Sequence, residues 1–395
     1  MPSVAALSEL LSTCYQASLL TEEGQPVTFR VALLEPEQLP LDDGPPTGYH
    51  RIRFSEPRPV VANILRKLSP AAEFSHALLG ILLGPEGFQI WGLIHSGPRW
   101  FNSFYNSRRA FQPLPRCLVV SVNGPGTLSV SSGSAVVARL SAGQVSAPGR
   151  DVLASKWLRE VFQSVRNELL DLQTDAAVSV DAQVGRRLTQ TMLRRSLQLL
   201  NIRGQGGALL VVPHEMGLQL EQPNPYVTVR YRFADEDPRR RFRGLMLKLM
   251  QRLHVLYPEL SQVGWQDYLR LQDAELSEVD EAMEEFSQLL ANLASVDGAV
   301  LLTQRIELLG FGVEIAGNLP AVTHIRRATD IEAQRTVEES TEGVGTRHRS
   351  AYRLCAQLDS VLALIHSQDR RIQLVKQLNG SVTCWDQLAT GARDL

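Results

Sequence analysis

The stretch Gly206-Gly207-Ala208-Leu209-Leu210-Val211-Val212 decides how the second half of this 395-residue chain folds. Its apolar run is short and contains β-branched valines, which favours a buried strand over a helix. A strand that is apolar along its whole length needs cover on both faces. We therefore expect a buried strand here.

A second short apolar strand, from Ala299 to Leu302, follows the pair Asp297-Gly298. The carboxylate of Asp297 should emerge at the edge of the sheet, where the glycine lets a ligand approach the backbone. A carboxylate in that position can bind a divalent cation. An Asp-Gly pair on its own is a turn signal in most proteins, so a functional interpretation needs a companion motif.

The companion is Gly345-Thr346-Arg347-His348-Arg349-Ser350-Ala351, which has the pattern of a helix start. Cationic side chains at a helix N-terminus oppose the helix dipole, so an anion is expected there. Free N–H groups, a Thr346 cap and two guanidinium groups would together form a receptor for a polyphosphate. The alternative is a solvated basic turn paired with nearby acidic residues, namely Glu338, Glu339 and Glu342.

The two motifs, DGA followed by GTRHR, resemble those of the diadenylate cyclase domain family. The resemblance extends to the strand Gly207 to Val212 and to the closing strand Ser360 to Ser367. It covers roughly the last half of the chain and nothing in residues 1–150. It implies that this half is an α/β domain, with a mixed sheet flanked by helices. It implies a nucleotidyltransferase that condenses two ATP into the second messenger cyclic di-AMP, with Mg²⁺ or Mn²⁺. Two such domains would face each other in a homodimer or larger homo-oligomer.

The resemblance also implies roles for individual residues. The catalytic motif is Asp297, Gly298 and Ala299, in which Asp297 serves the metal and the attacking 3′-hydroxyl. The residues that contact the ATP phosphates are Gly345, Thr346, Arg347, His348, Arg349 and Ser367. Val313 and Ile315 would lie beside the adenine.

The sequence departs from the family pattern at several positions. The family's Ser-Glu-Glu segment is Ser367-Gln368-Asp369 here, which removes one charge near the metal. Val296 replaces the histidine before DGA, and Val313-Glu314-Ile315 replaces Leu-Pro-Leu. These departures keep a second hypothesis open, in which the same fold binds a nucleotide for regulation without turning it over.

Residues 1–150 read as a separate α+β domain with an antiparallel sheet. Turn residues separate short strands, as at Gly84 to Gly87 before the strand Phe88 to Ile94. Cys117 to Val122 and Thr127 to Val130 form another expected hairpin, and a helix from Val60 to Leu68 would cover one face. In architecture it looks similar to the sensor-type domains that precede such cyclases, which implies a sensor or regulator whose ligand is unknown.

Residues 151–204 are expected to form a helical connector, because the apolar period changes to about 3.6 near Pro148. One helix would run from Trp157 to Leu172 and the next from Val184 to Leu200. Equally open is that both are core helices of the second half. Residues 205–395 form the cyclase-like domain.

An insertion at about 214–275 is expected to add a strand and a helix to the cyclase-like domain. The segment Tyr226 to Phe233 alternates as a strand should. An amphipathic helix then follows from Val279 to Leu293, with Ser277 and Asp280 as its expected cap.

The formal net charge of −2 supplies no global field that would attract nucleic acid or lipid. The run Arg239-Arg240-Arg241, with Arg243, is expected to be a solvated helix face, so nucleic-acid binding is not expected. No apolar stretch approaches the roughly 20 residues that cross a bilayer. Four cysteines without metal-type spacing indicate reduced thiols and a cytoplasmic protein.

A group of aromatic residues in the first domain could line a ligand pocket. Aromatic side chains on hairpins more often belong to the core, which is the favoured reading here. The group consists of Trp91, His95, Trp100, Phe101 and Tyr105.

Overall fold

The computed structural model describes residues 2–39, 44–45, 48–74, 76–97, 117–132, 135–141, 143–146, 152–162, 179–203, 206–259, 262–271, 273–367 and 372–387. The chain divides into two compact units. The first consists of Met1–Pro148 with Thr390–Leu395, and the second is Gly149–Ala389. Each unit has its own sheet and its own core.

The first unit contains an eight-stranded sheet in the order β10-β9-β8-β7-β3-β5-β6-β4. Its described strand pairs are antiparallel except for β3 with β5. The elements are α1 (Val4–Ser18), β1 (Thr21–Glu22), β2 (Gln25–Pro26), β3 (Phe29–Leu33), η1 (Pro36–Gln38), β4 (His50–Pro59), α2 (Ala62–Leu68), β5 (Ala77–Gly84), β6 (Gly87–His95), β7 (Leu118–Gly124), β8 (Thr127–Ser132), β9 (Ala135–Ser141) and β10 (Gln144–Ser146). The predicted α+β class, both hairpins and the helix α2 are confirmed.

Helix α1 was not anticipated from the sequence, although Ser3 caps it by accepting a hydrogen bond from the Ala6 N–H at 3.2 Å. Its buried residues Leu10 and Cys14 pack with Phe29 of β3 in one core cluster. This helix therefore completes the hydrophobic face that α2 alone would leave partly open.

Trp91 belongs to the core of the first unit. Its indole Nε1 donates to the Leu34 carbonyl at 2.9 Å, and only 3% of its surface is exposed. Gly80 makes room for the ring, since a Cβ added there would lie 2.1 Å from it. Half-buried His95 ends β6. Trp100, Phe101 and Tyr105 lie outside the described residues.

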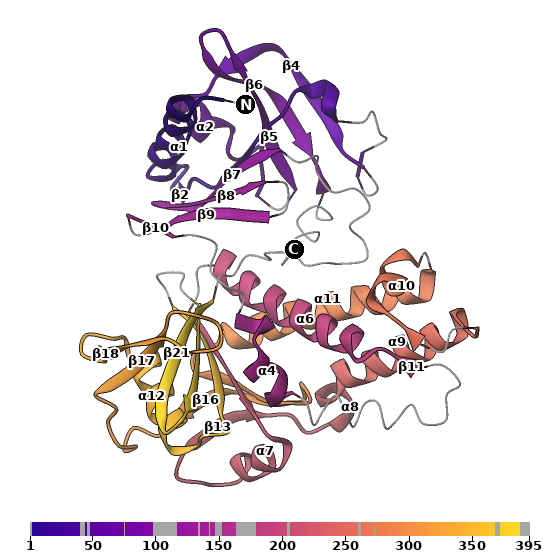
Figure 1. The fold of residues 1–395 in the computed structure, drawn as a ribbon, viewed down its shortest axis with the longest axis vertical. Helices are drawn as coiled ribbons and strands as arrows, with labels where there is room; N and C mark the ends of the chain where they lie inside the picture. The colour runs from indigo at the N-terminus through magenta and orange to yellow at the C-terminus, as the bar shows by residue number, and fades with distance from the viewer. Residues whose placement is uncertain are drawn as a thin grey trace. The chain divides into compact units, whose positions relative to one another are not determined.

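The second unit contains a nine-stranded mixed sheet in the order β13-β16-β15-β12-β19-β20-β21-β17-β18. Figure 1 labels β13, β16, β17, β18 and β21 of this sheet. Its elements are η2 (Val152–Ala154), α4 (Lys156–Val161), β11 (Ser179–Val180), α6 (Ala182–Arg203), β12 (Gly207–Val212), α7 (His214–Glu221), β13 (Val227–Arg232), α8 (Glu236–Arg239), α9 (Arg241–Leu256), β14 (Gln262–Val263), α10 (Trp265–Arg270), α11 (Ala274–Ala294), β15 (Ala299–Thr303), β16 (Leu308–Ile315), β17 (His324–Ala328), β18 (Thr336–Ser340), α12 (Thr346–Gln357), β19 (Leu362–His366), β20 (Ile372–Leu378) and β21 (Ser381–Gln387).

Helices cover both faces of this sheet, as the fully apolar strand β12 requires. Leu209 and Val211 pack into the cluster that contains α6, α9 and α11, whereas Ala208 and Leu210 pack into the cluster that contains α7 and α12. Neighbouring residues of β12 thus point to opposite cores. The predicted mixed sheet flanked by helices is confirmed.

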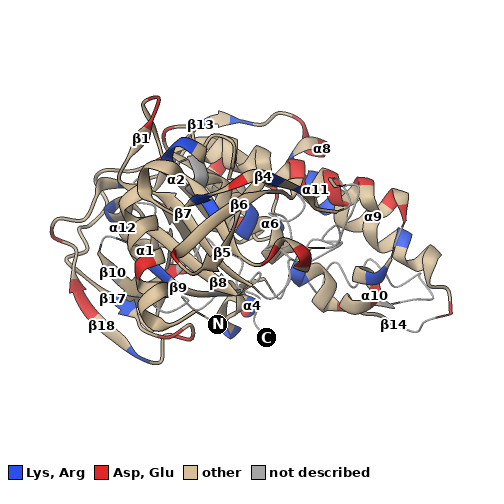
Figure 2. Ribbon diagram, turned by 90° about the horizontal axis from the view of Figure 1, so that it is seen from above, with Lys and Arg blue, Asp and Glu red and all other residues tan. Residues whose placement is uncertain are grey.

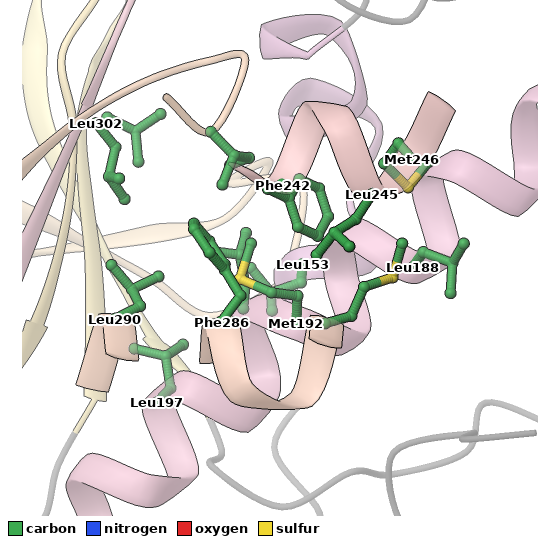
Figure 3. Close-up of a cluster of buried hydrophobic side chains, with 14 of the residues drawn as sticks. Leu153, Leu188, Met192, Leu197, Phe242, Leu245, Met246, Phe286, Leu290 and Leu302 are labelled. Carbon is green, nitrogen blue, oxygen red and sulfur yellow. The ribbon is translucent and has the colours of Figure 1, made fainter. Parts of the chain in front are cut away.

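The segment expected to be a helical connector contributes to the core of the second unit. Helix α6 packs against α11, and its Met192 and Leu197 lie in the buried cluster drawn in Figure 3. The Trp157 ring of α4 stacks on the Trp385 ring of β21, with the ring centroids 4.5 Å apart. The rest of the helix predicted after Val161 lies mostly outside the described residues.

The predicted start of α11 is wrong. The helix begins at Ala274, where the Asp273 side chain accepts from the Leu276 N–H at 2.9 Å. Asp280 is buried in its middle and accepts a hydrogen bond from the Tyr268 hydroxyl. The inserted region supplies the predicted strand as β13, which pairs with β16, and several helices including α9.

Two arginines of the run just before α9 form ion pairs. Arg239 lies 3.0 Å from Glu221, and Arg240 lies 2.9 Å from Glu236. Figure 2 shows acidic and basic residues interspersed along the ribbon. No helix in the described part of the chain is both long and apolar enough to span a membrane.

All four cysteines are buried, and none of them forms a disulfide. Burial raises the pKa of Cys14, Cys355 and Cys384 to about 12 and that of Cys117 to about 11. The thiols are therefore protonated near neutral pH and serve as small apolar side chains.

Replacing Leu302 by alanine should destabilise the second unit by about 2–5 kcal/mol, because the side chain is fully buried between the sheet and the α6–α11 layer (Figure 3). This loss of stability is measured by urea unfolding of the full chain, from the unfolding transition of the second unit. Leu218→Ala, at a position 47% exposed, is the control and should change stability by less than about 0.5 kcal/mol. Equal effects of the two variants would contradict the packing described above.

Candidate functional site

Three neighbouring strands bring the predicted site residues to one edge of the nine-stranded sheet. Strand β12 pairs in parallel with β15, with Leu209 beside Val300, and antiparallel with β19, with Gly207 beside His366. β12 begins at Gly207, β15 begins at Ala299 and β19 ends at His366, so these strand ends form a row at the same edge of the sheet. Asp297, Gly206 and Ser367 lie one or two residues from these ends in the sequence, at that edge.

Asp297 connects α11 to β15 at this edge, and its side chain is exposed. It forms no hydrogen bond or ion pair with any residue that the structure describes. Gly298 has φ +105°, and a Cβ added there would lie 2.7 Å from the Gly312 carbonyl carbon. A glycine is therefore needed for β16 to lie so close behind the carboxylate.

Val313 and Ile315 end β16 at the same edge, because β16 runs antiparallel to β15 and Val313 pairs with Ala299. Val313 is 2% exposed and belongs to the core, whereas Ile315 is half-buried. Ile315 is thus the more accessible of the two to a ligand.

The basic motif occupies the first turn of α12, as predicted. Gly345 is the N-cap, with φ −60° and ψ 154°, and it provides no side-chain cap. Thr346 is the first helical residue, so the prediction that it caps the helix is wrong. The first turn keeps N–H groups that could bind an anion. Thr346 and Arg349 are exposed, and Arg347 and His348 are half-buried.

Buried contacts direct the first turn of α12 toward the end of β19. Late in the helix, Cys355 Sγ lies 3.8 Å from the Val361 carbonyl, just before β19. One turn earlier, the Tyr352 hydroxyl donates to Gln373, which pairs with Ile365 near the other end of that strand. Burial raises the pKa of Tyr352, so its hydroxyl stays a neutral donor. The helix N-terminus consequently lies toward His366 and Ser367.

The guanidinium of Arg347 lies over Gly206. A Cβ added at Gly206 would be only 2.1 Å from Arg347 Nη1 and 3.4 Å from the His366 carbonyl oxygen. Arg347 thereby reaches the edge of the sheet that also carries Asp297. Gly206 was not identified as a site residue from the sequence, although two successive glycines before a buried strand were a usable signal.

The predicted acidic partners of a solvated basic turn are not seen. Neither Arg347 nor Arg349 forms an ion pair with a residue in the described ranges, and Glu339 instead pairs with Arg327 at 2.6 Å. An arginine beside a helix N-terminus and without a carboxylate partner there is suited to a phosphate or another anion.

A divalent cation could join this site only with help from a ligand. The described residues contain no group of three or more histidine, cysteine, aspartate or glutamate side chains that could hold a metal. A single carboxylate such as Asp297 fits Mg²⁺ that is bound mainly by substrate phosphates and water. Gln368 and Asp369, the other predicted neighbours, lie outside the described residues.

Comparison with known families identifies the N-terminal part of the chain. Residues 1–95 match the family described as probable sensor domain DACNV. No curated protein matches the chain. Residues 1–95 are thus similar to a probable sensor domain, and the second unit must be judged from its own motifs and geometry.

Replacing Gly206 by alanine should weaken binding of inorganic tripolyphosphate at least about tenfold, since the new methyl group would displace the Arg347 guanidinium. The displaced atoms are the far end of a flexible side chain, so the free energy of unfolding should change little. Isothermal titration calorimetry measures the affinity, and urea unfolding measures the stability.

Gly317→Ala is the matched control, because a Cβ there meets nothing within 4 Å. It should leave tripolyphosphate affinity unchanged. If Gly206→Ala behaved like this control, the contact between Gly206 and Arg347 would have no part in anion binding.

Proposed function

We propose that this protein is a diadenylate cyclase, which condenses two ATP into cyclic di-AMP and releases pyrophosphate under the control of its sensor unit. The observation that carries the proposal is that Asp297 precedes β15 at the edge where β12 begins, and that Arg347 Nη1 lies against Gly206, just before β12. The order of the DGA and GTRHR motifs and the sensor match at residues 1–95 support it.

The triphosphate would bind at the first turn of α12. Backbone N–H groups at Thr346 and beyond, together with Arg347 and Arg349, offer positive charge and directional donors. Nucleotidyl transfer depends mainly on positioning and charge neutralisation, and the leaving pyrophosphate carries most of the charge that develops. This turn would therefore hold the leaving group as well as the substrate.

Asp297 would face the ribose of ATP. In the reaction, a ribose 3′-oxygen loses its proton and forms a bond to the α-phosphorus of another ATP, and the bond to pyrophosphate breaks. Asp297 would orient that hydroxyl, accept its proton and hold the cation that accompanies ATP. Bound Mg²⁺ or Mn²⁺ would neutralise part of the negative charge on the phosphates. Ile315 and Val313 would lie beside the purine.

One chain would provide half of the reaction site. Each ATP must present its 3′-hydroxyl to the α-phosphate of the other, so two second units would face each other as a homodimer. The twofold symmetry of the product matches that of such a dimer. The exposure of Asp297 and Arg349 is compatible with this face-to-face arrangement.

The test is incubation of the purified full chain with ATP and Mg²⁺ or Mn²⁺, followed by measurement of pyrophosphate and cyclic di-AMP. The proposal expects both products, with two pyrophosphates for each ring. Bound ATP without either product would favour the alternative, a nucleotide-binding regulator on the same fold. Absence of ATP binding would exclude both functions.

Asp297→Asn should retain ATP affinity but lower cyclisation at least about 100-fold, because the amide neither holds the cation nor accepts the hydroxyl proton. Turnover and ATP affinity are measured on the same preparation. Glu215→Gln, an exposed substitution in the first turn of α7, is the control and should keep full activity. Parental turnover in Asp297→Asn would remove this residue from the mechanism.

Arg347→Ala should weaken ATP binding by about 2 kcal/mol or more, as expected for loss of a charge-assisted contact. Calorimetric titration of ATP measures the change. Arg353→Ala removes an arginine from the same helix, where Nη1 lies 3.4 Å from the Gly317 carbonyl, and should bind ATP normally. Equal losses in both variants would indicate a general charge effect instead of a phosphate contact.

A further inference from the structure

Three contacts fasten α4 to the sheet of the second unit, in the first described segment after the boundary between the units. The Trp157 ring stacks on Trp385 of β21, with an angle of 26° between the ring planes. The indole Nε1 of Trp157 donates to the Ile331 carbonyl at 2.8 Å. The Lys156 N–H donates to a Glu332 carboxylate oxygen, also at 2.8 Å. Because a helix of six residues is too short to be stable alone, these contacts hold α4 in place.

The Trp385 ring is the start of a series of contacts that crosses the sheet. Trp385 and Asp386 are neighbours in β21, so their side chains point to opposite faces. On the second face, Asp386 accepts a hydrogen bond from Gln373 of β20 at 3.0 Å. Gln373 in turn accepts one from the Tyr352 hydroxyl of α12 at 3.2 Å. Gln373 and Tyr352 are only 5% and 2% exposed, so water competes little for the bond between them.

Tyr352 connects this series of contacts to the first turn of α12. Its ring lies beside that of His348, one turn earlier, with the ring centroids 6.3 Å apart. His348 directly follows Arg347 in the basic motif. A shift of Tyr352 would therefore move His348 and Arg347 with it, since a single helix backbone joins all three.

The segment that contains α4 also contacts the hairpin that leads into α12. Ile331 and Glu332 lie between β17 and β18, and β18 is the strand that precedes the basic motif. Arg327 of β17 joins this hairpin to β21, because its guanidinium lies 2.6 Å from Glu339 and 2.7 Å from Asp386. Two routes thus run from α4 to the first turn of α12, one through β21 and one through β18.

We propose that Trp157 is a positioning residue for the first turn of α12, and that its contacts keep this turn ready to bind a polyphosphate. The inference rests on the proposed function, because it concerns the affinity of the same anion site. Release of the Trp157 ring would loosen Trp385 and the hairpin, so that α12 would be held less firmly. The segment follows the boundary after Pro148, and a movement of the chain there would regulate the site by changing its affinity for phosphate.

The first test measures the affinity of the full chain for inorganic tripolyphosphate by calorimetry. Trp157→Leu removes the stacked ring and the bond to Ile331, and should weaken binding at least about fivefold, the lower end of typical coupling between sites. Trp265→Leu is the matched control, because it removes a buried ring that packs against Tyr268 in α10, outside both routes. It should leave the affinity unchanged. Thermal unfolding checks that both variants are folded, and equal losses of affinity in the two would overturn the proposal.

The outcomes separate this inference from the function on which it rests. A parental chain that binds no tripolyphosphate would show that the anion site is absent, which overturns both. Binding by the parental chain with equal affinity in Trp157→Leu would overturn the inference alone, because the anion site would then work without the stacked ring.

A double-mutant cycle tests the route through β21. Tyr352→Phe removes only the hydroxyl that donates to Gln373. Trp157 and Tyr352 pack into the clusters on opposite faces of the sheet, so independent effects would multiply. Each substitution should weaken tripolyphosphate binding, and the double variant should weaken it by less than the product of the two effects. A product equal to the measured effect would exclude this route.

Hydrogen exchange tests the coupling from the other direction, since coupling between two sites is reciprocal. Saturating tripolyphosphate should slow exchange of the Lys156 amide, which donates to Glu332, by at least about fivefold. Mass spectrometry of peptides that cover residues 156–161 measures this rate. The slowing should be smaller in Tyr352→Phe. An unchanged rate in the saturated parental chain would contradict the proposal.

Discussion

The parallel pairing of β12 with β15, next to the antiparallel pairing of β12 with β19, is the constraint on which the candidate site depends. Parallel strands begin at the same edge of a sheet, and an antiparallel neighbour ends there. This register brings Gly206, Asp297 and Ser367 together although long segments of chain separate them. A change of pairing partner would scatter these residues, whatever their local sequence.

Glycines at this edge allow three other elements to come close. A Cβ at Gly207 would lie 2.5 Å from the Ala294 carbonyl oxygen at the end of α11, and one at Gly298 would meet β16. Gly206 similarly leaves space for the Arg347 guanidinium. The lack of side chains at these glycines thus allows the Asp297 carboxylate and the Arg347 guanidinium to take their positions. Substitutions at these glycines would alter the site without touching a charged group.

The features predicted well from the sequence were those with a strong local pattern. Short apolar runs identified β12 and β15, the family resemblance identified β19, and the turn residues identified the hairpins of the first unit. The cationic helix start was recognisable because its charges oppose the helix dipole. The convergence of Asp297 and Arg347 was expected only through the family resemblance, since no local pattern encodes strand order.

The errors arose where a distant contact overrides a local preference. Asp280 resembled a cap residue, but the Tyr268 hydroxyl bonds to it inside the core, and Asp273 caps α11 instead. Thr346 had the chemistry of a cap, yet Gly345 takes the extended conformation that defines the N-cap. The sequence left open whether α6 is a connector or a core helix, because its packing against α11 is a contact between distant segments of the chain.

The most direct measurement is a crystal structure of the chain with 3′-deoxy-ATP and Mg²⁺, because this analogue can bind but cannot close the ring. The account predicts that the triphosphate lies at the first turn of α12, in contact with Arg347, with the ribose C3′ facing an Asp297 carboxylate. A nucleotide bound elsewhere, for example at the carboxyl ends of β12 and β15, would contradict the central claim.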